Sequence, residues 1–195
     1  MSDKKNKIII HIIIYCHSDI GQKIFLKNFF KEDKKISHKS ETVFETVFNG
    51  EINLDSKNIL KCYLYVTDSD SRLRSLAKNS AGLILFFDPD EEKSFELFGN
   101  VFNNISEKNK TFDNLYITIL ANQFKETDIY QKAKKLAEEK KINFCVLEEN
   151  EINFIEGIIK KIYNFNQNKK QEINQKEDTS KGNAKKSREC CGCFN

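Results

Sequence analysis

The feature that most constrains the fold of this chain is an apolar run near its N-terminus, KIIIHIIIY at Lys7–Tyr15. His11 is the one polar residue inside it, so both faces of a strand built from this run carry apolar side chains. A strand with one solvated face alternates apolar and polar residues, whereas a parallel strand covered on both faces is continuously apolar. The eight residues from Ile8 to Tyr15 are too few to cross a bilayer, which takes about 20. The run therefore predicts a central parallel strand.

Later segments of similar character predict further strands at Thr46–Leu54, Ile59–Val66, Ala81–Asp88, Asn114–Asn122 and Asn143–Leu147. The polar turn Asp55-Ser56-Lys57-Asn58 joins the first two as a β-hairpin. Apolar residues at helical spacing predict helices at residues 24–30, Lys93–Ile105, Asp128–Lys141 and Asn153–Phe165, and the acidic residues from Asp88 onward predict the start of the second. The polar stretch before Ala81 predicts no element of its own.

This order of elements predicts an α/β fold. The expected sheet is six-stranded and mostly parallel, with one antiparallel edge strand from the hairpin and helices on both faces. Sites in such sheets lie at the carboxyl ends of the strands.

Length and composition predict one domain followed by a tail. Of the 195 residues, 1–163 carry the predicted elements, and apolar periodicity stops near Asn164. Residues 164–195 are rich in Lys, Asn and Gln, so we predict that they are disordered. A net charge of only +3 predicts no nucleic-acid partner, and the lack of a signal sequence predicts a cytoplasmic protein.

The six cysteines fall into two groups. Three are scattered singly over predicted strands, where a cysteine is usually a small buried hydrophobe: Cys16, Cys62 and Cys145. The other three crowd into the last six residues: Cys190, Cys191 and Cys193. Adjacent cysteines without a nearby histidine are poorly suited to a tetrahedral zinc site. Cysteines at an exposed C-terminus are more naturally lipid acceptors.

The loop that follows the first predicted strand, at residues 16–23, stands where a phosphate-binding loop would stand. Such a loop uses glycines to turn backbone N–H groups onto phosphate, a lysine as a cation, and a Ser or Thr hydroxyl on Mg²⁺. Here Gly21 is the one glycine. The loop is therefore either a degenerate nucleotide site or a plain strand-to-helix turn.

Three segments resemble one protein family. RLRSL (Arg72–Leu76), AGLILFFDPDEEKSFELF (Ala81–Phe98) and the terminal double cysteine match Rab-like proteins in type and order. On these residues the chain resembles a small GTPase of the Ras superfamily, and its Rab branch in particular, over residues 7–163 and the tail. The resemblance implies the P-loop small-GTPase fold, GTP or GDP and Mg²⁺ as ligands, and geranylgeranyl groups on the terminal cysteines. It also implies a vesicle-trafficking role, with effector or regulator proteins, prenylation machinery and a cytoplasmic membrane leaflet as partners.

The family motifs carry over incompletely. In the phosphate loop, Ser18 and Gly21 lie among the binding positions, while Gln22 stands at the lysine and Lys23 at the hydroxyl residue. Thr42 is the candidate for the first-switch threonine, with Thr46 as its rival.

In the second motif, Val66 stands at the carboxylate that holds Mg²⁺, and Asp70 stands at the Gln that orients the attacking water. Asp68 and Asp70 are either substitute metal ligands or part of a solvated turn. No catalytic residue is assigned.

The guanine-reading motif keeps Asn122 but has Lys125 in place of an aspartate. The aspartate accepts hydrogen bonds from the base, whereas a lysine can only donate. The last motif, Ser-Ala-Lys, aligns with Glu148-Glu149-Asn150.

Three hypotheses follow. The first is a membrane-tethered Rab-like protein that has largely lost GTP binding and hydrolysis, a pseudo-GTPase. The second is an active GTPase switch with a divergent pocket. The third is an unrelated α/β interaction module such as a receiver-like domain, which would need more acidic residues near the first strand than Asp19 and would leave the cysteine tail unexplained.

Overall fold

The computed structural model describes residues 5–17, 40–41, 46–106, 112, 114–147 and 154–186. At 40–41, 46, 100, 103–106 and 176–186 it describes the backbone. The predicted helix at residues 24–30 lies outside the described residues.

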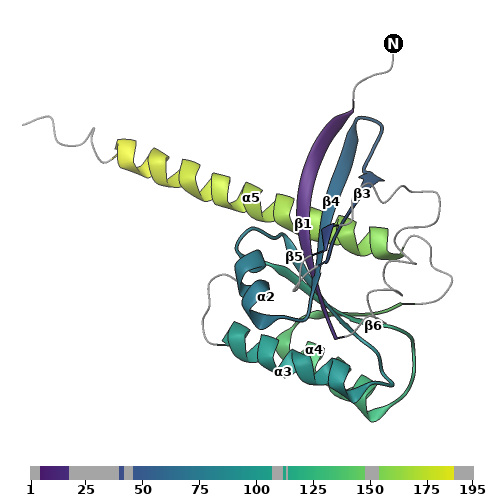
Figure 1. Cartoon of the computed structure of the whole chain (residues 1–195). Helices are drawn as coiled ribbons and strands as arrows, with labels where there is room; N and C mark the ends of the chain where they lie inside the picture. The colour runs from purple at the N-terminus through teal and green to yellow at the C-terminus, as the bar shows by residue number, and fades with distance from the viewer. Residues whose placement is uncertain are drawn as a thin grey trace, which may run out of the picture.

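The sheet has the strand order β2-β3-β4-β1-β5-β6-β7. Figure 1 labels β1 and β3 to β6 of this sheet. Its parallel strands are β1 (Asn6–Cys16), β4 (Asn58–Thr67), β5 (Gly82–Phe87), β6 (Tyr116–Ala121) and β7 (Asn143–Val146). β3 (Thr46–Asn53) is antiparallel to β4, and the two-residue β2 (Ser40–Glu41) pairs with the outer edge of β3. The predicted mostly parallel sheet is therefore confirmed. One detail differs, because β2 adds a seventh strand outside the antiparallel strand that we expected at the edge.

The β3–β4 hairpin closes as its turn residues predict. The side chain of Asp55 accepts hydrogen bonds from the backbone N–H groups of Lys57, at 2.7 Å, and Asn58, at 2.9 Å. An aspartate that bonds to the backbone two residues ahead mimics a turn and fixes it in place. β1 then pairs with β4 over Asn6–Tyr15, which makes β1 a central strand as its apolar run predicts.

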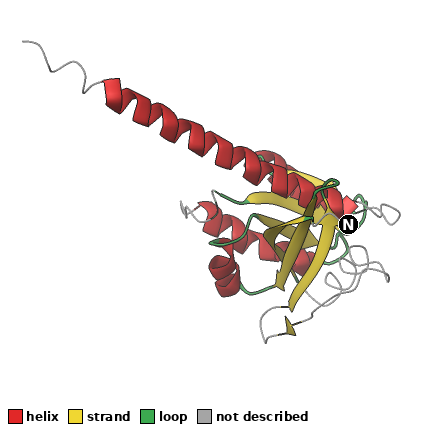
Figure 2. Ribbon diagram, turned by 90° about the horizontal axis from the view of Figure 1, so that it is seen from above, coloured by secondary structure: helices red, strands yellow, loops and turns green. Residues whose placement is uncertain are grey.

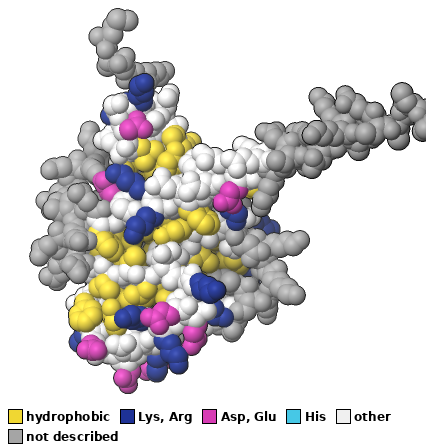
Figure 3. Space-filling view, turned by 180° about the vertical axis from the view of Figure 1, so that it is seen from behind, with side chains coloured by type: hydrophobic (Ala, Val, Ile, Leu, Met, Phe, Trp, Pro, Cys, Tyr) yellow, Lys and Arg dark blue, Asp and Glu magenta, His cyan; other side chains and the backbone are white. Residues whose placement is uncertain are grey.

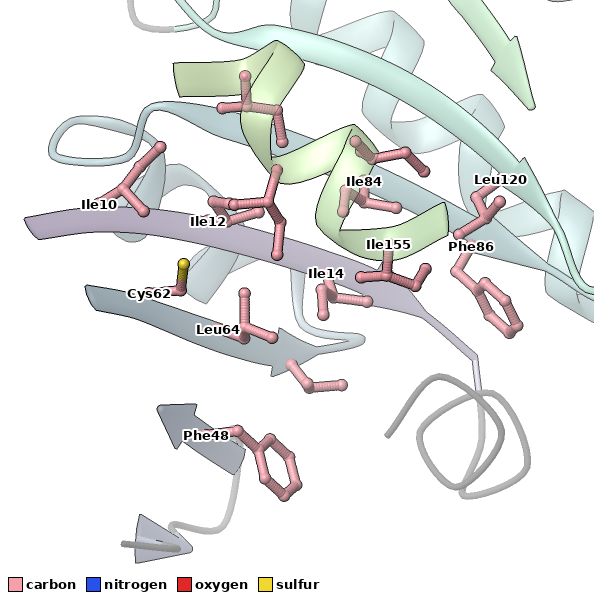
Figure 4. Packing of buried hydrophobic residues seen from close by; sticks show 14 of the residues in the cluster. Ile10, Ile12, Ile14, Phe48, Cys62, Leu64, Ile84, Phe86, Leu120 and Ile155 are labelled. Carbon is pink, nitrogen blue, oxygen red and sulfur yellow. The ribbon is translucent and has the colours of Figure 1, made fainter. Parts of the chain in front are cut away.

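Helices cover both faces of the sheet, as predicted (Figure 2). α2 (Asp70–Ala77), α3 (Glu92–Ser106) and α4 (Asp128–Lys140) pack on one face, and α5 (Phe154–Lys186) packs on the other. Successive side chains of β1 point to opposite faces of the sheet. Ile12 and Ile14 belong to the hydrophobic cluster under α5, and Ile13 belongs to the cluster under α2, α3 and α4. Figure 4 shows the α5 side, where Ile155 of α5 packs among residues of β1 and β5.

Two predictions are wrong. The stretch before Ala81 contains α2, whose apolar content is limited to Leu73, Leu76 and Ala77, too few to make a helical pattern visible. The second error concerns the tail, because α5 continues from the packed segment to Lys186 instead of ending in disorder near Asn164. No proline interrupts it, and a helix that is already nucleated extends through polar residues at little cost.

The scattered cysteines behave as small hydrophobes. Cys16 and Cys62 are buried, and Cys145 is half-buried. Burial raises the pKa of Cys62 to about 12, and burial together with the charge of Asp68 does the same for Cys16.

None of the helices described in the structure is both long enough and apolar enough to span a membrane. On the face drawn in Figure 3, acidic and basic side chains are interspersed.

Candidate functional site

Four loops meet at one edge of the sheet, because β1, β4, β5 and β6 run parallel and end on the same side. These loops begin at His17, Asp68, Asp88 and Asn122. The chain reverses its direction of strand addition at β1, which lies between β4 and β5. Crevices at such a switch point are where open α/β sheets bind ligands. The structure therefore brings the described parts of the aligned motifs to one edge.

The loop after β6 is joined to the loop after β5. The Asn122 side-chain amide donates a hydrogen bond of 3.0 Å to Asp88 Oδ2, and Lys125 Nζ donates one of 2.5 Å to Asp90 Oδ1. Thr127, which caps α4 by accepting a hydrogen bond from the Tyr130 N–H, also donates to the carbonyl of Pro89. The two residues aligned with the guanine-reading motif are thus bound to acceptors from their own chain.

These contacts differ in strength. The Lys125 and Asp90 side chains are 52% and 46% exposed, so water screens their ion pair and it contributes at most about 1 kcal/mol. The Asn122–Asp88 bond is partly buried, so water competes with it less than with the Lys125–Asp90 pair. Together they give the loop after β6 an arrangement in which residue 125 contributes a cation that is paired with the carboxylate of Asp90.

The loop after β4 is tied to β1. The hydroxyl of the fully buried Tyr15 donates to Asp70 Oδ1 at 2.5 Å. Burial, followed by this hydrogen bond, raises the pKa of Tyr15, so the tyrosine stays protonated and remains a donor. Asp70, at the first position of α2, is therefore a structural acceptor here, and the neighbouring Asp68 is exposed.

Val66 points into the apolar core. It is 1% exposed and belongs to the same cluster as Phe48 and Leu64. A metal-binding carboxylate at this position would have to leave that cluster to reach an ion. Among the residues that the structure describes, no group of three or more His, Cys, Asp or Glu side chains could hold a metal ion.

His17, directly after β1, is a neighbour of this edge that the sequence did not single out. Its Nδ1 lies 3.7 Å from Glu91 Oε1, and its ring lines a hollow of about 260 Å³ with Lys93, Glu96 and Leu97. Its place immediately after the central strand was the only signal available, and one histidine in a loop is too common to indicate a site.

The remaining candidates lie outside the described residues. They are Ser18, Gly21, Gln22 and Lys23 of the phosphate loop, Thr42 of the first switch, residues 148–150, and the cysteines at 190, 191 and 193.

No family model matches this chain, and no curated protein matches it.

Proposed function

We propose that the protein is a membrane-tethered member of the Rab-like small GTPases whose pocket has lost most of its capacity to bind and hydrolyse GTP. In this role it acts at the cytosolic face of an intracellular or plasma membrane, as a scaffold for trafficking effectors or regulators. Geranylgeranyl groups on the C-terminal cysteines would attach it there.

The fold supports the proposal at a coarse level. A mostly parallel sheet with its switch point at β1 and helices on both faces is compatible with a P-loop or Rossmann-like fold. The segments RLRSL and DPDEEKSFELF, on which the resemblance rests, fall on α2 and on the start of α3.

The observation that carries the proposed loss of GTP binding is the contact of Lys125 with Asp90. A guanine base offers two donors, its N1–H and its amino group, to the aspartate of the family motif. The ammonium group of Lys125 can only donate hydrogen bonds, so it cannot accept from the base. It already donates to the carboxylate of Asp90. The two base donors therefore find no acceptor on Lys125 and exchange the aspartate of the family motif for water, which removes its contribution to guanine selectivity. Val66 in the apolar core adds the loss of the carboxylate that would hold Mg²⁺.

The tail supports the proposed attachment. Stable anchoring needs two lipid chains, or one chain with a basic patch. Residues 164–195 offer three cysteines near the end and more basic than acidic residues, and each Lys or Arg near an anionic leaflet gains about 1 kcal/mol.

Nucleotide extraction tests the proposed loss of GTP binding. Protein purified without added nucleotide is denatured, and the supernatant is separated by ion-exchange chromatography. We expect less than a tenth of a mole of guanine nucleotide per mole of protein, and no rise in melting temperature with GTP and Mg²⁺. Stoichiometric GDP or GTP would refute the proposal and favour the active, divergent GTPase.

Two variants refine this test. Lys125→Asp restores the acceptor for guanine, and Lys125→Asp combined with Asp90→Asn also removes the repulsion that the new carboxylate would meet. Lys140→Asp, on the exposed last turn of α4, is the matched charge change away from the loop. We expect a gain in guanine-nucleotide binding in Lys125→Asp and in the double variant with Asp90→Asn, and no gain in Lys140→Asp.

Attachment is tested separately by mass spectrometry of the C-terminal peptide from native cells. A mass increase for one or two geranylgeranyl groups is expected. An unmodified CCGCFN peptide would remove the membrane role without affecting the conclusion on nucleotide.

A further inference from the structure

The C-terminal half of α5 extends beyond the sheet. Figures 1 and 2 both show the helix crossing the sheet and then continuing away from it. Its 33 residues give a length of about 50 Å at 1.5 Å per residue. The buried residues of α5 end at Ile162, and Gln171–Gln175 are exposed. About 30 Å of helix, from Asn166 to Lys186, therefore follows the last buried residue of α5.

A set of contacts fixes the helix where it leaves the sheet. The Asn166 side-chain amide donates to the carbonyl of Ala81 at 2.9 Å, and to that of Ile162 at 2.8 Å. The Phe165 ring meets the edge of Tyr116 at 5.5 Å between centroids, and Lys169 Nζ lies 5.8 Å from the centre of the Phe165 ring. We call these contacts of Phe165, Asn166 and Lys169 the collar. They join α5 to the start of β5 and to β6, so they set the direction in which the helix departs.

The close approach of α5 to the sheet at this end depends on Gly82. A Cβ atom at Gly82 would lie 2.7 Å from Cγ2 of Ile162, inside any normal contact distance. The absence of a side chain at Gly82 lets Ile162 seat against β5 one turn before the collar.

The sequence beyond the collar suits a helix that stands in water. The packed segment of α5 supplies the nucleus, so each further residue adds a hydrogen bond without a new nucleation cost. Ile173, 50% exposed, is the single large apolar residue among the described side chains past the collar, so this surface is not built to pack against the sheet.

We propose that α5 from the collar to Lys186 is a rigid arm directed toward the C-terminal cysteine cluster, which holds its own end at Lys186 a fixed distance of about 30 Å from the sheet. The inference deepens the proposed function, because it takes these cysteines as the points of membrane attachment. Cys190 follows the last helical residue, Lys186, by four positions. A flexible chain of the same 20 residues would have a root-mean-square span of about 25 Å with a broad spread, and would let the sheet settle at any distance from the membrane.

Pulsed electron-electron double resonance on the unlipidated full-length protein tests the arm. Nitroxides carried by unnatural amino acids at Lys161 and Lys186 avoid the native cysteines, and Lys161 is exposed on the packed part of α5. We expect a narrow distribution centred near 37 Å between the backbone positions, from 25 residues of helix. Ile173→Pro should broaden and shorten it, whereas the matched Ile173→Ala should leave it unchanged. A wild-type distribution as broad as that of Ile173→Pro would overturn the proposal.

The collar is tested with labels at Lys78, the exposed residue that follows α2 as its C-cap, and at Gln175. Asn166→Ala removes both amide hydrogen bonds, and Asn168→Ala is the same change at an exposed position two residues further on. We expect Asn166→Ala to widen the distance distribution at least twofold and Asn168→Ala to leave it as in the wild type. Equal distributions in the two variants would exclude the collar as the fixing element.

These measurements need no lipid, so the arm and the attachment succeed or fail separately. A narrow distribution with unmodified cysteines would keep the arm and remove its membrane role. Lipidated cysteines with a broad distribution would keep the attachment and replace the arm by a flexible tether.

Discussion

The hydrogen bond between Tyr15 and Asp70 gives the sharpest test of what the edge of the sheet does. Tyr15 is fully buried, and its hydroxyl donates to a carboxylate that water can partly reach. A hydrogen bond to a charged group contributes about 1.5–3 kcal/mol to stability. Tyr15→Phe removes the donor and leaves Asp70 free to bind water, so we expect a loss of about 2 kcal/mol in the free energy of unfolding.

Changes at Asp70 should differ according to what replaces the carboxylate. Asp70→Asn keeps an acceptor oxygen and should cost about 1 kcal/mol, whereas Asp70→Ala leaves the buried hydroxyl without a partner at about 1–3 kcal/mol. Asp68→Asn is the matched control, since Asp68 is exposed and should change stability by less than about 0.5 kcal/mol. In a chain of this length, 2 kcal/mol corresponds to about 4–8 °C in melting temperature.

Equilibrium unfolding in urea, followed by circular dichroism, measures these differences, and the double variant Tyr15→Phe/Asp70→Ala completes a cycle. We expect the double variant to lose at least about 1 kcal/mol less than the sum of the single losses, since both changes delete one interaction. Additive losses would show that the two groups do not interact. A melting temperature that rises with Mg²⁺ in the wild type, but not in Asp70→Asn, would instead identify Asp70 as a metal ligand.

Two other predictions concern the core. Gly82→Ala should destabilise the protein by about 1–3 kcal/mol in urea unfolding, because its Cβ collides with Ile162, whereas Gly157→Ala on α5, with nothing within 4 Å, should stabilise it by about 0.5–1 kcal/mol. Destabilisation by both would contradict the packing at Gly82. The thiols of Cys16 and Cys62, whose pKa burial raises to about 12, should resist iodoacetamide at pH 8.5 in the folded protein and react on unfolding. Since the pKa is higher in the folded state, their contribution to stability is present below pH 9 and is lost as the pH rises toward 12. Rapid alkylation of both thiols in the folded state would refute their burial.

The sheet was predictable because burial on two faces leaves a direct record in the sequence. The apolar run of β1 and the Asp55–Asn58 turn specify their structures locally, and both are observed. α2 escaped prediction because a helix of eight residues needs few apolar positions to cover one patch of the sheet. The prediction ended α5 too early because apolar periodicity indicates packing, and the side chains of Gln171–Gln175, described beyond the packed segment, are exposed.

The candidate site was only partly predictable for a different reason. The sequence places Asn122, Lys125 and Asp70 at or just after the ends of predicted strands, and the structure brings them to one edge of the sheet, because the ends of parallel strands determine the edge. Their partners could not be read from the sequence. Asp90 lies 35 residues from Lys125, and Tyr15 lies 55 residues from Asp70, so each contact depends on how loops from different strands meet in space.

The side chains of β1 alternate between two apolar layers, and this alternation separates a force applied to α5 from the contacts that hold the loops at the sheet edge. Tension applied to α5 reaches Ile12 and Ile14, which contact the layer beneath that helix. Ile13 and Tyr15 face the other way, among α2, α3 and α4. A force applied to the C-terminal end of α5 therefore acts first on the side chains of β1 that pack under α5. It reaches the Tyr15–Asp70 contact on the other face only through the backbone of β1.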